Sequence, residues 1–144
     1  MSDPIFTSLL STDLGTVEKP KALPPGQYEG TIKEYKLDKS REKQTPFVRF
    51  TFNNISPGAD MDPALLVGVD FSKKSLNRDY YLTTDALWRI KDFLQSLGHN
   101  VSGKTIGEIL PLTSGALVLI DVTQRNSPDG KEIYNDVKDV VGKP

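Results

Sequence analysis

The stretch Phe47-Val-Arg-Phe-Thr-Phe52 carries the clearest strand pattern in the chain. Side chains of a β-strand point alternately to its two faces, so Val48, Phe50 and Phe52 share one face. We expect this apolar face to lie in the hydrophobic core and the alternate residues to face solvent. One apolar face per strand is typical of an antiparallel sheet.

Further strands are predicted on both sides of this stretch. The pattern of alternation begins at residue 27, and Gly30 within it is the expected place of a bulge or sharp bend. A polar loop is predicted at residues 38–45, and residues 65–71 fit either a strand or an ordered loop. The remaining predicted strands are residues 76–82, 116–123 and 131–141, the last two joined by the turn Ser127-Pro-Asp-Gly130.

One amphipathic helix is predicted between the third and fourth of these strands. Thr83 or Thr84 is the expected N-cap, Asp85 lies in the first turn, and Gly98 stands where a C-terminal cap is expected. A second, shorter helical turn is predicted where Thr105 and Glu108 fit a capping box, and Pro111 limits it. The apolar stripe of the main helix consists of Leu87, Ile90, Leu94 and Leu97, at spacings of three and four.

The order of elements predicts a mainly β protein. Three strands, a helix and two further strands are the layout of an OB-fold, a five-stranded Greek-key barrel. The alternative is an α+β sandwich with the helix on one face of the sheet. We expect a flexible N-terminal arm over residues 1–24 and one folded domain over residues 25–144, a length that suits a single domain.

Composition narrows the classes of function. The chain has no cysteine and one histidine, His99, which excludes thiolate catalysis and any site built from several Cys or His ligands. Neither a membrane span nor a signal peptide is recognisable, so we expect a cytoplasmic protein without contact to a membrane. We find no catalytic motif and expect binding, not catalysis, with no cofactor.

One motif requires a separate argument. Gly98-His-Asn-Val-Ser-Gly103-Lys104-Thr105 fits the phosphate-loop pattern G-x-x-x-x-G-K-[ST]. A phosphate loop follows a strand and opens a substantial helix, whereas here a predicted helix precedes the motif and Pro111 follows closely. We therefore interpret it as a helix cap and a polar loop, although a nucleotide-dependent enzyme remains the third alternative.

Charge and aromatic residues favour single-stranded DNA as the ligand. The chain has a net charge of −1, but residues 31–50 contain six cations and three anions, which gives this window +3. Binders of single strands combine cations that contact phosphates with aromatic rings that stack on bases, and an OB-fold gathers them over its second and third strands and two loops. The predicted contact residues are Lys33, Tyr35, Lys39, Arg41, Lys43, Phe47, Arg49, Tyr80, Arg125, Lys131 and Tyr134.

Three short motifs support the same interpretation. Leu23-Pro-Pro-Gly-Gln-Tyr-Glu-Gly30, the helix that ends in Leu97-Gly98, and Tyr134-Asn-Asp-Val137 resemble small phage-encoded single-stranded DNA-binding proteins. The resemblance covers residues 23–141 and implies an OB-fold core that protects displaced or replicating strands in the host cytoplasm. It leaves open replication or recombination proteins as partners, and self-association. The ending Val140-Val-Gly-Lys-Pro144 lacks the acidic tail of bacterial-type relatives, so recruitment by such a tail is not expected.

A second class of function stays open. The near-neutral charge and the apolar cluster at residues 6–10 also fit a protein-interaction barrel of a phage assembly or regulatory module. Measuring DNA binding, and testing whether a protein partner is captured, would distinguish a DNA-binding protein from a protein-interaction barrel.

Overall fold

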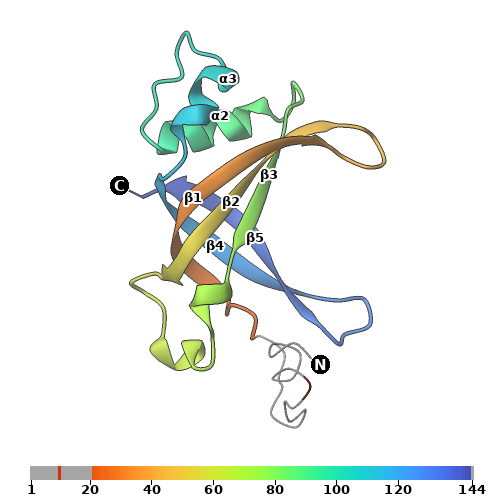
Figure 1. Cartoon of the computed structure of the whole chain (residues 1–144), viewed down its shortest axis with the longest axis vertical. Coiled ribbons are helices and arrows are strands. Elements are labelled where there is room, and N and C mark those ends of the chain that lie inside the picture. The colour runs from red at the N-terminus through yellow and green to blue at the C-terminus, as the bar shows by residue number, and fades with distance from the viewer. Residues whose placement is uncertain (1–9, 11–20, 144) are drawn as a thin grey trace, which may run out of the picture.

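The computed structural model describes Leu10 and residues 21–143 of the chain. The predicted arm therefore lies largely outside the described residues. Five antiparallel strands form one curved sheet in the order β3-β2-β1-β4-β5 (Figure 1). The strands are β1 (Gly26–Lys39), β2 (Pro46–Pro57), β3 (Leu76–Tyr81), β4 (Leu117–Asn126) and β5 (Ile133–Gly142).

Two α-helices lie between β3 and β4, as the sequence predicts: α2 (Leu87–Ser96) and α3 (Ile106–Ile109). The 3-10 helices are η2 (Pro63–Leu66), η3 (Phe71–Lys73) and η4 (Leu110–Leu112). The strand alternative for residues 65–71 is wrong, because η2, η3 and the turn between them occupy this stretch. No helix within residues 21–143 is long and apolar enough to cross a membrane.

The mainly β architecture with five strands is confirmed, but closure of the sheet into a barrel is not. Strands β3 and β5 are the two edges of the sheet, and no backbone ladder joins them. The side chain of Arg78 spans this seam instead. Its Nη1 donates to the carbonyl oxygens of Val137 and Lys138 at 3.0 and 2.7 Å.

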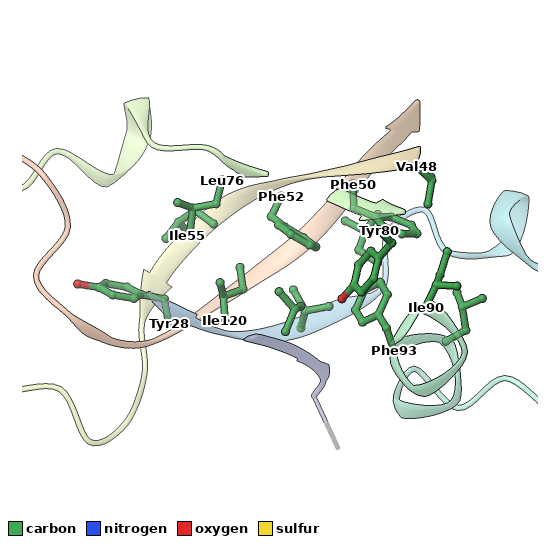
Figure 2. Packing of buried hydrophobic residues seen from close by; sticks show 14 of the residues in the cluster. Tyr28, Val48, Phe50, Phe52, Ile55, Leu76, Tyr80, Ile90, Phe93 and Ile120 are labelled. Carbon is green, nitrogen blue, oxygen red and sulfur yellow. The ribbon is translucent and has the colours of Figure 1, made fainter. Parts of the chain in front are cut away.

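The inner face of the sheet is the one that alternation predicts. Val48, Phe50 and Phe52 are fully buried (Figure 2). Phe50 lies against two further aromatic rings, Tyr80 of β3 and Phe93 of α2, whose centroids are 5.8 and 5.1 Å from its own. These rings join the helix to the sheet.

Strand β1 contains the predicted irregularity. Its register against β2 shifts between Glu29 and Thr31 and again between Ile32 and Glu34. A Cβ at Gly30 would lie 3.0 Å from the δ-methyl groups of Ile120 and Ile55, which is tighter than ordinary packing. Gly30 thus lets β1 bend closely over the core, as predicted.

Helix α2 begins later than predicted. Its N-cap is Ala86, with no side-chain cap, so the prediction of Thr83 or Thr84 is wrong. The carbonyl oxygen of Thr83, not a hydroxyl, accepts from the N–H groups of Ala86 and Leu87 in a preceding turn. The C-terminal cap is confirmed, because Gly98 has a φ of +94° and donates to the carbonyl of Gln95.

Two smaller local predictions are also confirmed. Thr105 and Glu108 form the capping box at the start of α3. In the turn between β4 and β5, the N–H of Gly130 donates to the carbonyl of Ser127 at 2.9 Å.

A polar clamp joins the first described residues to the last hairpin. The N–H of Leu23 donates to Asn135 Oδ1, and the Leu23 carbonyl accepts from Asn135 Nδ2 and Gln124 Nε2. The side chain of Leu23 is fully buried in the core. Two of the motifs that carry the family resemblance therefore contact each other, and packing reaches back to Leu23, ahead of the predicted boundary at residue 25.

Candidate nucleic-acid interface

The outer face of β2 and β3 carries three cross-strand pairs. The register places Phe47 opposite Tyr81, Arg49 opposite Asp79 and Thr51 opposite Asn77. Side chains opposite each other in an antiparallel pair lie on the same face. This face therefore changes from an aromatic pair near the β1–β2 loop to polar pairs further along.

Tyr81 is the exposed ring of the aromatic pair. Its side chain is 42% exposed, whereas Phe47 is only 7% exposed. Phe47 packs edge-on against Tyr81 at 5.8 Å, and the guanidinium of Arg49 lies 5.3 Å from the Phe47 ring. Phe47 thus lies on the predicted outer face but is covered by its neighbours. Tyr81 is the ring of this pair that is accessible for stacking.

The choice of Tyr80 as an outward residue is wrong. Tyr80 is 5% exposed, stacks on Phe93 at 5.2 Å, and points into the core (Figure 2). Burial raises the pKa of its phenol to about 12. Because side chains alternate along a strand, one of the two adjacent tyrosines must face outward. The position of Leu76 could have shown which one. Leu76, the only aliphatic residue of β3, shares its face with Tyr80 and marks that face as the inner one.

Arg49 is paired within its own sheet. Its Nε donates to Asp79 Oδ1 at 2.7 Å, and its Nη2 donates to Asp79 Oδ2 at 3.0 Å. This hydrogen-bonded carboxylate raises the pKa of Arg49 above its usual value. Lys36, next to Arg49 on β1, has Glu34 3.7 Å away. Acidic neighbours therefore offset both cations in the middle of the face.

Three cations that form no ion pair with any described residue lie at the end of β1 and in the β1–β2 loop, which begins at residue 40 and not at residue 38 as predicted. Lys39, Arg41 and Lys43 are exposed, and within the described part of the chain none of them forms an ion pair. The loop itself is ordered by hydrogen bonds between Ser40 and Thr45 in both directions, from the Ser40 N–H to the Thr45 carbonyl and from the Thr45 N–H to Ser40 Oγ. Its positive charge is thus held in a defined place beside β3.

A groove of about 510 Å³ joins this loop to the exposed ring. The loop residues Arg41, Glu42 and Lys43 line it together with Tyr81 and Thr83. Cations and an accessible aromatic ring therefore border the same hollow. The sequence predicted the two cations of this groove. It left Tyr81 as the alternative to Tyr80 for the outward tyrosine, and it missed Thr83.

A second groove crosses the seam between β3 and β5. It has a volume of about 490 Å³ and is polar, with Arg49 and Asp79 on one side and Asp136 on the other. It lies between the predicted residues of the two hairpins, whose loops extend to the same side of the view in Figure 1. The carboxylates of this groove repel an anionic ligand unless the paired arginines, Arg49 and Arg125, turn from these carboxylates toward the ligand.

The predicted residues of the β4–β5 hairpin form a small network of their own. The Arg125 guanidinium lies 5.1 Å from the ring of Tyr134, and its Nε donates to Asp136 at 3.0 Å. The Tyr134 hydroxyl donates to Glu132 at 2.7 Å, and this hydrogen bond raises the pKa of the phenol. Lys131 is exposed in the turn. This hairpin supplies a half-exposed ring, but its arginine is already paired.

Two predicted residues of β1 lie apart from this face. Lys33 is exposed at the register shift. Tyr35 pairs with Phe50 and is half-buried against the core, so its expected outward position is wrong. The bulge is real, but it turns Tyr35 to the inner face.

The elements around the phosphate-loop motif, residues 98–105, are those expected for a helix cap and a polar loop. Helix α2 precedes it, and the helix that it opens, α3, has four residues. Within the described part of the chain, no three or more His, Cys, Asp or Glu side chains form a group that could hold a metal ion.

Comparisons with known proteins do not assign a family. A search against protein-family models finds no match to this chain, and a search of curated proteins finds no similar sequence.

Proposed function

We propose that this chain binds single-stranded DNA without sequence preference. The observation that supports this most directly is the groove beside the β1–β2 loop, where Tyr81 lines the same hollow as Arg41 and Lys43, which form no ion pair with any described residue. Stacking tolerates every base because each has an aromatic face, and cations contact any phosphate. The groove thus combines the two interactions that a sequence-tolerant binder needs.

We further propose that the sheet is an open OB-type barrel. Its strand order places β3 and β5 at the edges, Arg78 links them across the seam, and α2 lies between β3 and β4 along the chain. In an OB-fold the ligand crosses the second and third strands between the first and last hairpin loops. This path runs from Tyr81 over Arg49 to Arg125 and Tyr134. The protein then belongs with the phage single-stranded DNA-binding proteins that its motifs resemble, and would act on replicating or recombining DNA.

Binding to labelled oligo-dT, measured by fluorescence anisotropy at several salt concentrations, tests the proposal. We expect micromolar or tighter binding that weakens with salt, and much weaker binding to the duplex of the same strand. Replacing Tyr81 with leucine should remove one stacked base and weaken binding by about 1–3 kcal/mol, whereas Tyr81→Phe keeps the ring and serves as the control. Absence of binding to oligo-dT at low salt would refute the function.

Removing the partner of Arg49 should strengthen binding. In Asp79→Asn the guanidinium loses its carboxylate and becomes available to a phosphate. One additional phosphate contact is expected to raise the affinity roughly fivefold at about 0.1 M salt and to steepen the salt dependence by about 0.7 in log–log slope. Asp60→Asn, in an exposed loop, makes the same charge change elsewhere. Equal effects of the two variants would show that net charge, not Arg49, is responsible.

A further inference from the structure

An apolar groove lies between α2 and α3, at the end of the molecule that carries the helices (Figure 1). It has a volume of about 370 Å³, and its apolar lining consists of Leu87, Ile90, Leu94, Val101, Ile106 and Ile109. Trp88 stands at its border with 57% of its surface exposed. An exposed tryptophan beside an apolar hollow is typical of a surface that another polypeptide covers.

The charged residues of this groove are both basic. Lys91 and Lys104 line it, and within residues 21–143 neither forms an ion pair. Its occupant should therefore be apolar with acidic residues beside the apolar ones.

The first twenty residues of the chain have this composition. They contain Asp3, Asp13 and Glu18 against the single cation Lys19. Their larger apolar residues include two pairs four apart, Ile5 with Leu9 and Phe6 with Leu10, a spacing that places each pair on one face of a helix. Leu10, which the structure describes, is 82% exposed and is not packed against its own domain.

We propose that residues 3–14 of one copy dock into the α2–α3 groove of a second copy. The apolar residues of the segment would cover the lining of the groove, and its carboxylates would approach Lys91 and Lys104. This contact is independent of DNA and gives the chain a self-association surface separate from the nucleic-acid interface.

The distance between Leu23 and the groove favours docking of the segment into a second copy over docking into its own copy. Leu23 is held by Asn135, while Gly142, seven residues further along β5, donates to Ser96 Oγ at the end of α2. Seven strand residues span about 23 Å, and the groove continues beyond Ser96 along α2 toward Leu87. The nine residues from Leu14 to Leu23 reach at most about 32 Å when fully extended. Docking within one copy would therefore require this linker to be nearly fully extended to reach the far end of the groove at Leu87.

The contact is heterologous, because the surface that one copy presents is not the surface that it occupies on the next. Such contacts form open chains unless the rotation between copies closes a ring. Sedimentation velocity of the full-length protein without DNA should therefore show mass increasing with concentration, to a dimer if two copies exchange their arms and beyond a dimer if the contacts form an open chain. Trp88 is the only tryptophan, so its emission should change over the same concentration range.

Two full-length variants separate the two sides of the contact. L10D removes an apolar contact from the arm, and K91E/K104E reverses the charge of the groove. The three substituted residues are exposed, so these changes should leave the fold intact. Loss of a central apolar anchor is expected to weaken self-association roughly 30-fold or more. The control K73E/K138E makes the same charge change on other exposed lysines and should associate like the unmodified protein.

Mixing the two defective variants gives the decisive result. L10D keeps a functional groove and K91E/K104E keeps a functional arm, so together they should form one-to-one dimers that extend no further. A monomeric unmodified protein, or unaltered association of L10D, would overturn the proposal. A monomer whose Trp88 emission differs between the unmodified protein and L10D would instead show docking within one copy, which also overturns it.

Discussion

The charge reversal K39E/R41E/K43E is expected to lower the affinity for oligo-dT roughly 100-fold at about 0.1 M salt and to reduce the log–log salt slope by about 2. These three cations are exposed and form no ion pair with any described residue, so their side chains are available to contact phosphates. Each phosphate contact to a single strand contributes roughly a factor of five at this salt concentration through counterion release. Three contacts multiply to the expected loss, and the repulsion by the new carboxylates adds to it.

A matched control separates local contact from net charge. K73E/R89E/K138E makes the same total charge change at exposed positions away from the outer face of β2 and β3. Anisotropy with an oligonucleotide short enough for one protein should show the full loss only for the loop variant. Equal losses would mean that the strand is attracted by overall charge, and no loss in either would remove the β1–β2 loop from the binding site.

Local patterns predicted most of the fold. The two-residue period of Phe47 to Phe52, the apolar stripe of α2 and the turn at Ser127 each depend on neighbours in sequence. The strand and the turn formed where they were expected because the same residues supply both the pattern and the packing. Of the predicted stripe, Ile90 and Leu94 are buried, but Leu87 is exposed and Phe93, which was not predicted, is buried in its place. The open seam between β3 and β5 was not predictable in this way, since the side-chain contact across it, from Arg78 to the Lys138 carbonyl, joins residues 60 positions apart.

The candidate site was predicted less well because its properties arise between strands. The pairing of Arg49 with Asp79 joins residues 30 positions apart, so the positive charge of the window at residues 31–50 overstates what the folded face presents. Phe47 lies on the expected face, yet Tyr81 and Arg49 cover it. What survives from the sequence prediction is the loop, whose cations have no cross-strand partner among the described residues.

The substitution Phe93→Ala is expected to reduce the free energy of unfolding by about 3–5 kcal/mol. Phe93 is 3% exposed and lies between Phe50 and Tyr80, at ring distances of 5.1 and 5.2 Å. Removing its ring opens a cavity beside Phe50 of β2 and Tyr80 of β3, two closely packed aromatic rings that fill little of the space that it leaves. This loss is a large fraction of the roughly 5–15 kcal/mol that stabilises a typical domain.

Urea unfolding followed by far-ultraviolet circular dichroism measures this loss, with Gln95→Ala, an exposed change two residues further along α2, as the control. The control should stay within about 0.5 kcal/mol of the unmodified protein. Because Phe93 lies on the inner side of the sheet and Tyr81 on the outer side, the folded fraction of Phe93→Ala should still bind oligo-dT. A loss below about 1 kcal/mol would mean that α2 does not pack over Phe50 and Tyr80, and the groove between α2 and α3 would then lose its fixed wall.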